Sequence, residues 1–329
     1  MSTKTTKTRK PDFLSRIHAH IRDQYIRFFE YGHKYVIQFP SKENTIKNTS
    51  VTTWIHRHFP AFDSDKIIQN IFRSKHFREG HKYWGLTAAQ IKQKWSDDAQ
   101  LGTDLHYRIE CFMNFHYENH SFFFKESISI KEEKEKEKEK EKEDEKEDEK
   151  EEEKKEEKED KVSFYCTHKD LLKDYYENQT KDKSEDKGEP KEWEFFLQFV
   201  QDTPELVPYR TEWIIFHEDF HLAGSIDMVY INKENGKLAI YDWKRCLDIS
   251  SENPFHQFAS AACISYLPDT KYWHYALQLN LYKFILEDKY DKEVSEMYLI
   301  RLHPTATGYE KIEVPNLQDE IRKMIGEAL

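Results

Sequence analysis

Residues 224–246, GSIDMVYINKENGKLAIYDWKRC, include Asp227, Asp242 and Lys244, whose types and spacing could carry chemistry. In a strand, Asp242 and Lys244 point to one face and the intervening Trp243 points to the other, toward the core. The turn between the two apolar runs can bring Asp227 opposite Asp242. Two converging carboxylates suit Mg²⁺ or Mn²⁺, and a neighbouring lysine can polarise a water or offset charge on a phosphate. These residues predict metal-assisted phosphodiester hydrolysis, although a buried Asp–Lys ion pair at a sheet edge is an alternative.

Two further pairs of polar residues have helical spacing. His106 and Glu110 are four residues apart, as are Gln278 and Tyr282, so each pair shares one face of a helix. Taken alone, either pair is better explained as an ordinary solvated or half-buried polar helix face.

Together, four segments resemble the motifs of RecB-type nucleases of the PD-(D/E)xK superfamily, in the order that the family has them. GTDLHYRIE resembles the GTxxHxxxE helix, GSIDMVY the GxxD strand, YDWKR the (D/E)xK strand and QLNLY the QxxxY helix. The resemblance covers roughly residues 101–304. It implies metal ligands on His106, Asp227 and Asp242, helped by the Trp243 carbonyl.

The resemblance also implies roles for other residues. Lys244 would be the catalytic lysine, and Gln278 and Tyr282 would position the nucleic-acid strand near the scissile phosphate. Glu212, in YRTEW, matches an acidic strand residue often found just before the GxxD strand, so it joins Asp227, Asp242 and Lys244 as a catalytic candidate. Glu110 is expected to orient a neighbour instead of binding metal.

The pattern of elements predicts an α/β (α+β) fold with a restriction-endonuclease-like αβββαβ core, a mixed sheet flanked by helices. Helical spacing in FLSRIHAHIRDQYIRFF, DSDKIIQNIF and TAAQIKQKW predicts a helical N-terminal region over 1–100, with Asp63 and Thr87 as helix caps. A nuclease domain is predicted over 101–329. Its strands begin near Tyr209, and Asn235-Gly236 indicates a hairpin turn.

Residues 131–161 are all charged, with 12 lysines and 19 acidic residues, and we interpret them as a low-complexity insert in the nuclease domain. The chain carries a net charge of −11, of which the insert accounts for −7. The remaining −4 gives no overall basic surface. A nucleic-acid site must therefore be local.

The cysteines and the hydropathy restrict the class of protein further. Cys111, Cys166, Cys246 and Cys263 form no CxxC pair, which favours reduced thiols in an intracellular protein. No run of about 20 apolar residues predicts a membrane span, so we expect a soluble protein with no membrane partner. Some family members hold an iron–sulfur cluster on cysteines after the QxxxY helix. This chain has none there, so no cluster is expected and the resemblance is to the cluster-free branch, which includes mitochondrial genome maintenance exonucleases.

We therefore expect a Mg²⁺- or Mn²⁺-dependent DNA nuclease, in particular an exonuclease acting on single-stranded DNA or duplex ends in replication, repair or recombination. The alternative is a module of the same fold that binds nucleic-acid ends without cutting them. A degenerate module should lack Lys244 or a carboxylate, and none is missing. No GxxxxGK[ST] motif is present, so unwinding driven by ATP would need a helicase or replication partner.

Overall fold

The β-rich runs form the three antiparallel strands that the sequence predicts. The computed structural model describes residues 12–29, 31–32, 34–39, 46–115, 166–179 and 189–328, so the predicted insert lies outside the described residues. Strands β4 (Pro208–His217), β5 (Leu222–Ile231) and β6 (Leu238–Lys244) pair in antiparallel order. Gly236 has a φ of 71°, which suits the predicted Asn-Gly turn because glycine adopts the left-handed region without a Cβ clash.

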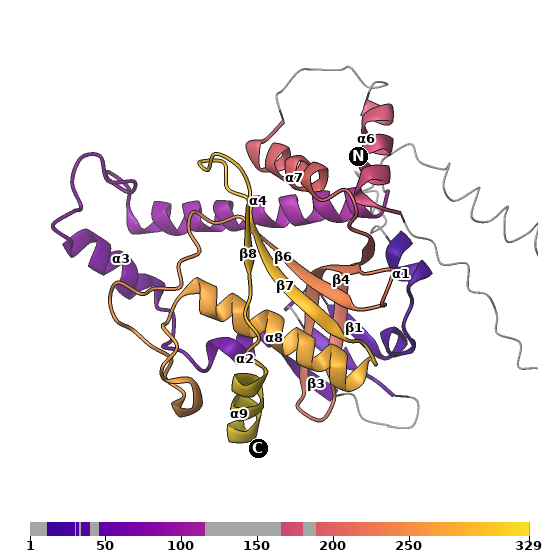
Figure 1. The fold of residues 1–329 in the computed structure, drawn as a ribbon. Coiled ribbons are helices and arrows are strands. Elements are labelled where there is room, and N and C mark those ends of the chain that lie inside the picture. Colours follow the sequence, from indigo (N-terminus) through magenta and orange to yellow (C-terminus); the bar gives the residue numbers. More distant parts are fainter. Residues whose placement is uncertain are drawn as a thin grey trace, which may run out of the picture.

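The sheet as a whole is mixed, because it contains parallel as well as antiparallel strand pairs. Helix α8 (Lys271–Lys289) connects β6 to β7 (Val294–Arg301), which pairs with β6 in parallel, and β8 (Glu310–Glu313) closes this edge. Ile240 and its strand neighbour Tyr241 belong to two different core clusters, as side chains on opposite faces of a sheet must. Figure 1 shows α8 on one side of the sheet and α4 on the other. This is the predicted αβββαβ core.

Helix α4 (Ala88–Met113) is one helix of 26 residues, spanning two segments that the sequence analysis treats separately. Thr87 caps it by accepting from the Gln90 N–H, and Asp63 caps α3 (Ser64–Arg73) by accepting from the Lys66 N–H, so both predicted caps are confirmed. The described helices also include α6 (His168–Gln179), α7 (Lys191–Asp202) and α9 (Gln318–Ala328). None of the helices in the described ranges is long and apolar enough to cross a bilayer.

The prediction of a wholly helical N-terminal region is wrong. A helix does form at α1 (Phe13–Ile17), and a short 3₁₀ helix at Ile21–Tyr25, but three strands follow before α2 (Val51–His56). They are β1 (Ile26–Phe29), β2 (Lys34–Ile37) and β3 (Ile46–Ser50).

The reason is that tertiary pairing outweighs the local helical spacing. Ile26 pairs with Ile37 in an antiparallel β1–β2 ladder, and both side chains are buried in the core cluster that α8 covers. Strand β3 then joins β5 in parallel through Thr49 and Ser50. The N-terminal region thus extends the sheet, while the domain boundary at residue 100 stays a prediction.

Candidate active site

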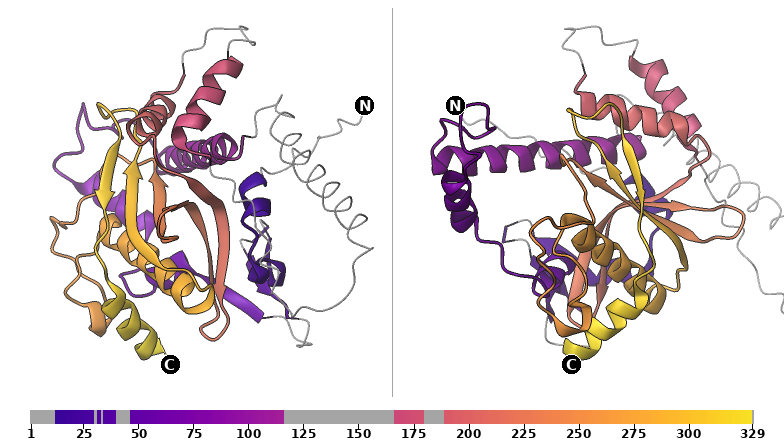
Figure 2. Two further views of the ribbon diagram at one scale, coloured as in Figure 1. Left: turned by 45° about the vertical axis from the view of Figure 1, so that its right-hand side comes forward. Right: turned by 60° about the vertical axis from the view of Figure 1, so that its left-hand side comes forward.

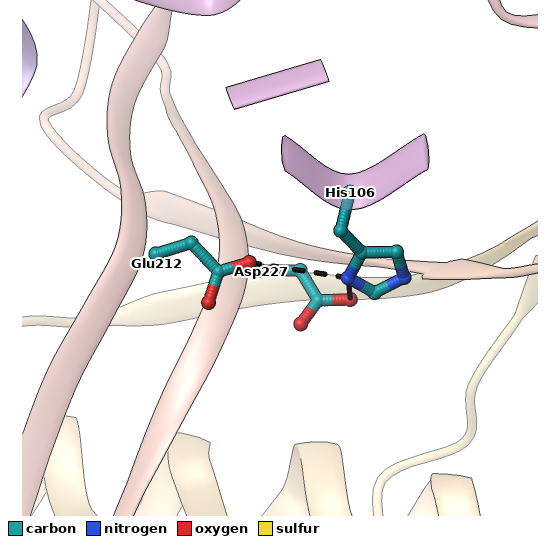
Figure 3. Close-up of side chains that lie close together, drawn as sticks. All are labelled: His106, Glu212 and Asp227. Carbon is teal, nitrogen blue, oxygen red and sulfur yellow. Dashed lines mark ion pairs between the residues drawn. The ribbon is translucent and has the colours of Figure 1, made fainter. Parts of the chain in front are cut away.

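Three side chains from three elements converge beside the sheet. His106 comes from α4, Glu212 from β4 and Asp227 from β5, and one potential ligand atom of each lies within 4.8 Å of the others. The imidazole Nδ1 of His106 is 3.5 Å from the Asp227 carboxylate and 3.9 Å from that of Glu212. Figure 3 shows the three side chains directed toward one another. We call these residues the acidic–histidine cluster.

The backbone of β6 fixes the orientation of His106. Its Nε2 lies 2.9 Å from the Trp243 carbonyl oxygen, which can only accept, so Nε2–H donates and Nδ1 faces the carboxylates. Burial lowers the pKa of His106, but the charge of Asp227 and the Glu212 carboxylate outweigh it and raise that pKa to about 9. At neutral pH the imidazole therefore carries a proton at Nδ1. A metal cation could bind at Nδ1 instead of this proton.

Glu212 reaches the cluster from an unusual backbone conformation. Its φ of 42° lies in the left-handed region, although it sits inside strand β4 and is not glycine. Its carboxylate accepts a hydrogen bond of 2.9 Å from the Ser225 hydroxyl. Outliers of this kind persist only where the surroundings hold them in place. Neither the positive φ nor the role of Ser225 follows from the sequence pattern.

Asp242 and Lys244 face the same side of β6, as predicted, and form an ion pair. The Asp242 side chain is only 2% exposed, and its burial together with nearby Asp227 raises its pKa to about 6, against the effect of Lys244. The Lys244 pKa is also raised, because the attraction of Asp242 and Asp227 exceeds the cost of burial. Lys244 is therefore protonated at neutral pH. Trp243 packs on the opposite face against Phe196 and Phe199.

The predicted ligand set and the observed cluster differ in one member. In the described part of the chain, the group of ligand atoms within 4.8 Å contains Glu212 and does not contain Asp242. Glu110, one turn after His106, also contributes no atom to this group. Asp227 nevertheless accepts a hydrogen bond of 3.0 Å from the Trp243 N–H, which ties β5 to the Asp242 end of β6.

Gln278 and Tyr282 form a pair on α8, as their spacing predicts. The Gln278 amide donates to the Tyr282 hydroxyl at 3.1 Å. Tyr282 is 2% exposed, and its ring covers Gly224, where an added Cβ would lie 2.7 Å from the Tyr282 Cε1 atom. The glycine of the GxxD segment is thus required by the close approach of α8 to β5. Because Tyr282 is buried, the half-buried Gln278 is the member of the pair better placed to meet a strand.

A pocket of about 260 Å³ opens beside the cluster, between α4, the end of β6 and the start of α8. His106 and Lys244 line it together with Tyr275, a residue that the sequence analysis missed. The Tyr275 ring lies 4.5 Å from the Lys244 ammonium. Its position three residues before Gln278 and seven before Tyr282 places it on the same helix face, a signal that could have revealed it.

Comparison with known proteins agrees with this arrangement. No curated protein matches the chain. A family model for the PD-(D/E)XK nuclease superfamily matches residues 79–328, which include the acidic–histidine cluster, the Asp242–Lys244 pair and the sheet core. This match covers most of the chain and begins before the predicted domain boundary at residue 100. The chain therefore belongs to the PD-(D/E)XK nuclease superfamily.

Proposed function

We propose that this protein is a divalent-metal-dependent DNA nuclease that hydrolyses phosphodiester bonds. The observation that carries the proposal is the convergence of the acidic–histidine cluster with the buried Asp242–Lys244 pair, in a chain of a nuclease superfamily. Such a constellation has the parts that phosphodiester hydrolysis needs: anionic ligands for a cation, a fixed positive charge and an adjoining pocket.

The donor set fits a divalent cation. Two carboxylates and an imidazole nitrogen approach one point, and the His106 Nδ1 faces this point because Nε2 is engaged by the Trp243 carbonyl. We propose His106, Glu212 and Asp227 as ligands, with Asp242 and the Trp243 carbonyl also near. A nitrogen ligand favours Mn²⁺ relative to Mg²⁺, which prefers oxygen. When bound, the ion would lower the pKa of an attacking water and neutralise charge on the phosphate.

The other residues act through charge and position. Lys244 is protonated, so it can donate to a phosphate oxygen or to the attacking water and cannot serve as a base. Asp242, paired with it, keeps the ammonium directed toward the site. Gln278 would contact the strand, supported from behind by Tyr282.

Exonuclease action on single-stranded or end-containing DNA, in replication, repair or recombination, is part of the proposal. It is supported by the resemblance of the four motifs to RecB-type nucleases. A helicase or replication partner is proposed on the same ground.

The test is digestion of end-labelled single-stranded, duplex and circular DNA with Mg²⁺, Mn²⁺ or EDTA. Linear DNA should be degraded from an end with either metal, and circular DNA should survive. Asp227→Asn should reduce the rate by about 10²-fold or more. Asp248→Asn, a matched change at an exposed carboxylate outside the cluster, should not. Absence of metal-dependent cleavage in the wild type would overturn the proposal.

A further inference from the structure

Residues 62–95 project away from the sheet as an arm at the N-terminal end of α4 (Figures 1 and 2). The arm consists of α3, the connecting turns and the first part of α4. It has a small core of its own, built on Ile68, Tyr83 and Ile91. Its outer surface is therefore not needed to stabilise the body of the protein.

The arm is basic in an acidic chain. It has three acidic residues against seven lysines and arginines. The residues outside both the arm and the insert 131–161 carry a net charge of −8. Asp63 is engaged as the α3 cap, and Asp65 pairs with Lys92. Within the part of the chain that the structure describes, no other basic residue of the arm has an ion-pair partner. The seven basic side chains are all exposed: Lys66, Arg73, Lys75, Arg78, Lys82, Lys92 and Lys94.

Large aromatic side chains are exposed between these charges. Trp84 is 50% exposed and Phe72 is 39% exposed, and their rings pack on Phe77 at 5.2 Å and 5.1 Å. Phe62 is 75% exposed and lies 6.4 Å from the Trp95 ring. Single-stranded nucleic acid binds to surfaces on which aromatic rings lie among lysines and arginines, because its bases stack on the rings and its phosphates pair with the cations.

Helix α4 connects the arm to the candidate active site. Lys92 precedes His106 by fourteen residues, which is about 21 Å at about 1.5 Å per residue. A base-stacked strand covers this distance in about six nucleotides at about 3.4 Å each. The pocket beside the cluster is lined by the intervening part of α4, from Asp98 to His106. Three acidic residues, Asp97, Asp98 and Asp104, lie between Lys92 and His106. Asp98 is the one that lines the pocket, and it lies 3.8 Å from the Arg245 guanidinium, which offsets its charge.

We propose that the arm binds the single strand whose phosphodiester enters the active site, with bases stacked on Trp84 and Phe72 and phosphates on the surrounding lysines and arginines. This inference rests on the proposed function. The proposed substrate is a single strand that extends beyond the scissile bond on the side of the arm, by about six nucleotides when its bases are stacked.

Binding is measured in EDTA, where no cleavage occurs, by fluorescence anisotropy of a labelled strand of about 30 nucleotides at several salt concentrations. Trp84→Ala should weaken binding about tenfold, the size expected for one lost stack. Lys75→Glu/Arg78→Glu should weaken it as well and reduce the slope of log K against log salt by about 1.4. The matched control is Lys169→Glu/Lys323→Glu, with the same change of charge on exposed residues of α6 and α9, and should bind like the wild type.

Cleavage is then compared on strands of about 30 and about 4 nucleotides, because a base-stacked strand of about 4 nucleotides spans only about 14 Å and stops short of the arm. The loss caused by the arm variants should be at least about tenfold larger on the long strand. Unchanged binding by both variants would overturn the inference, and would leave the proposed function intact if the wild type still cleaves. An equal loss for blunt duplex would overturn the single-strand assignment. A wild type that binds through the arm but cleaves nothing would overturn the proposed function alone.

Discussion

Replacing Gly224 by alanine tests the packing that holds α8 against the sheet at the site. The new Cβ would lie 2.7 Å from the Tyr282 Cε1 atom and 3.1 Å from its hydroxyl oxygen. Carbon atoms in contact prefer about 3.5–4.0 Å, so the ring must retreat by about 1 Å. Tyr282 is 2% exposed and lies within a helix, so it has no free space to move into.

Overpacking of this kind costs about 2 kcal/mol, within a usual range of about 1–3 kcal/mol. Removing a glycine from a strand returns about 0.5–1 kcal/mol, because the unfolded chain loses conformational freedom. The free energy of unfolding should therefore fall by about 1–1.5 kcal/mol, which lowers the melting temperature by about 2–6 °C. Cleavage should fall too, because Gln278 donates to the displaced Tyr282 hydroxyl.

The assay is thermal and chemical denaturation of Gly224→Ala beside Gly326→Ala. Gly326 lies in α9, and no atom of the described residues lies within 4 Å of an added Cβ, so its replacement should stabilise the fold by about 0.5–1 kcal/mol. Tyr282→Leu in the Gly224→Ala background makes room for the methyl group, so the double variant should lose less stability than the two single losses added together. A Gly224→Ala protein as stable as the wild type, or more stable, would refute the reasoning.

Three further predictions concern charges. Lys244→Met should reduce cleavage by about 10²-fold or more and should destabilise the fold, because Asp242 stays buried without its cation. In chemical denaturation, the double variant Asp242→Asn/Lys244→Met should be more stable than the single variant Lys244→Met. Burial lowers the pKa of His168 to about 3, so as the pH falls the unfolded chain takes up a proton that the folded chain does not. Relative to His168→Gln, the wild type should lose about 2–3 kcal/mol of unfolding free energy as the pH falls from about 6.5 to about 4.5. Parallel pH profiles of the two proteins would contradict this. Deleting 131–161 should leave activity and melting temperature nearly unchanged, since the segment has no apolar residue; a fall of more than a few degrees would show that it packs on the domain.

The sequence by itself determined the features that depend on local spacing. The period of two in β6 puts Asp242 and Lys244 on one face and Trp243 in the core, and the structure has this arrangement. The caps Asp63 and Thr87 mark the starts of α3 and α4 because a side-chain oxygen satisfies a helix N–H only a few residues away. The order of strands and helices after Tyr209 follows from the same local periodicities.

Only the tertiary structure decided which distant elements meet. Strand β3 joins β5, and His106 points its Nδ1 at Glu212 because the Trp243 carbonyl engages the other ring nitrogen. Glu212 has a left-handed backbone inside β4 and accepts a hydrogen bond from Ser225 of β5, and no local sequence pattern encodes either feature. Gly224 is explained only by the ring of Tyr282, nearly sixty residues later in the chain. A periodicity reports which face of an element is buried, whereas the partner on that face depends on packing that brings together residues remote in sequence.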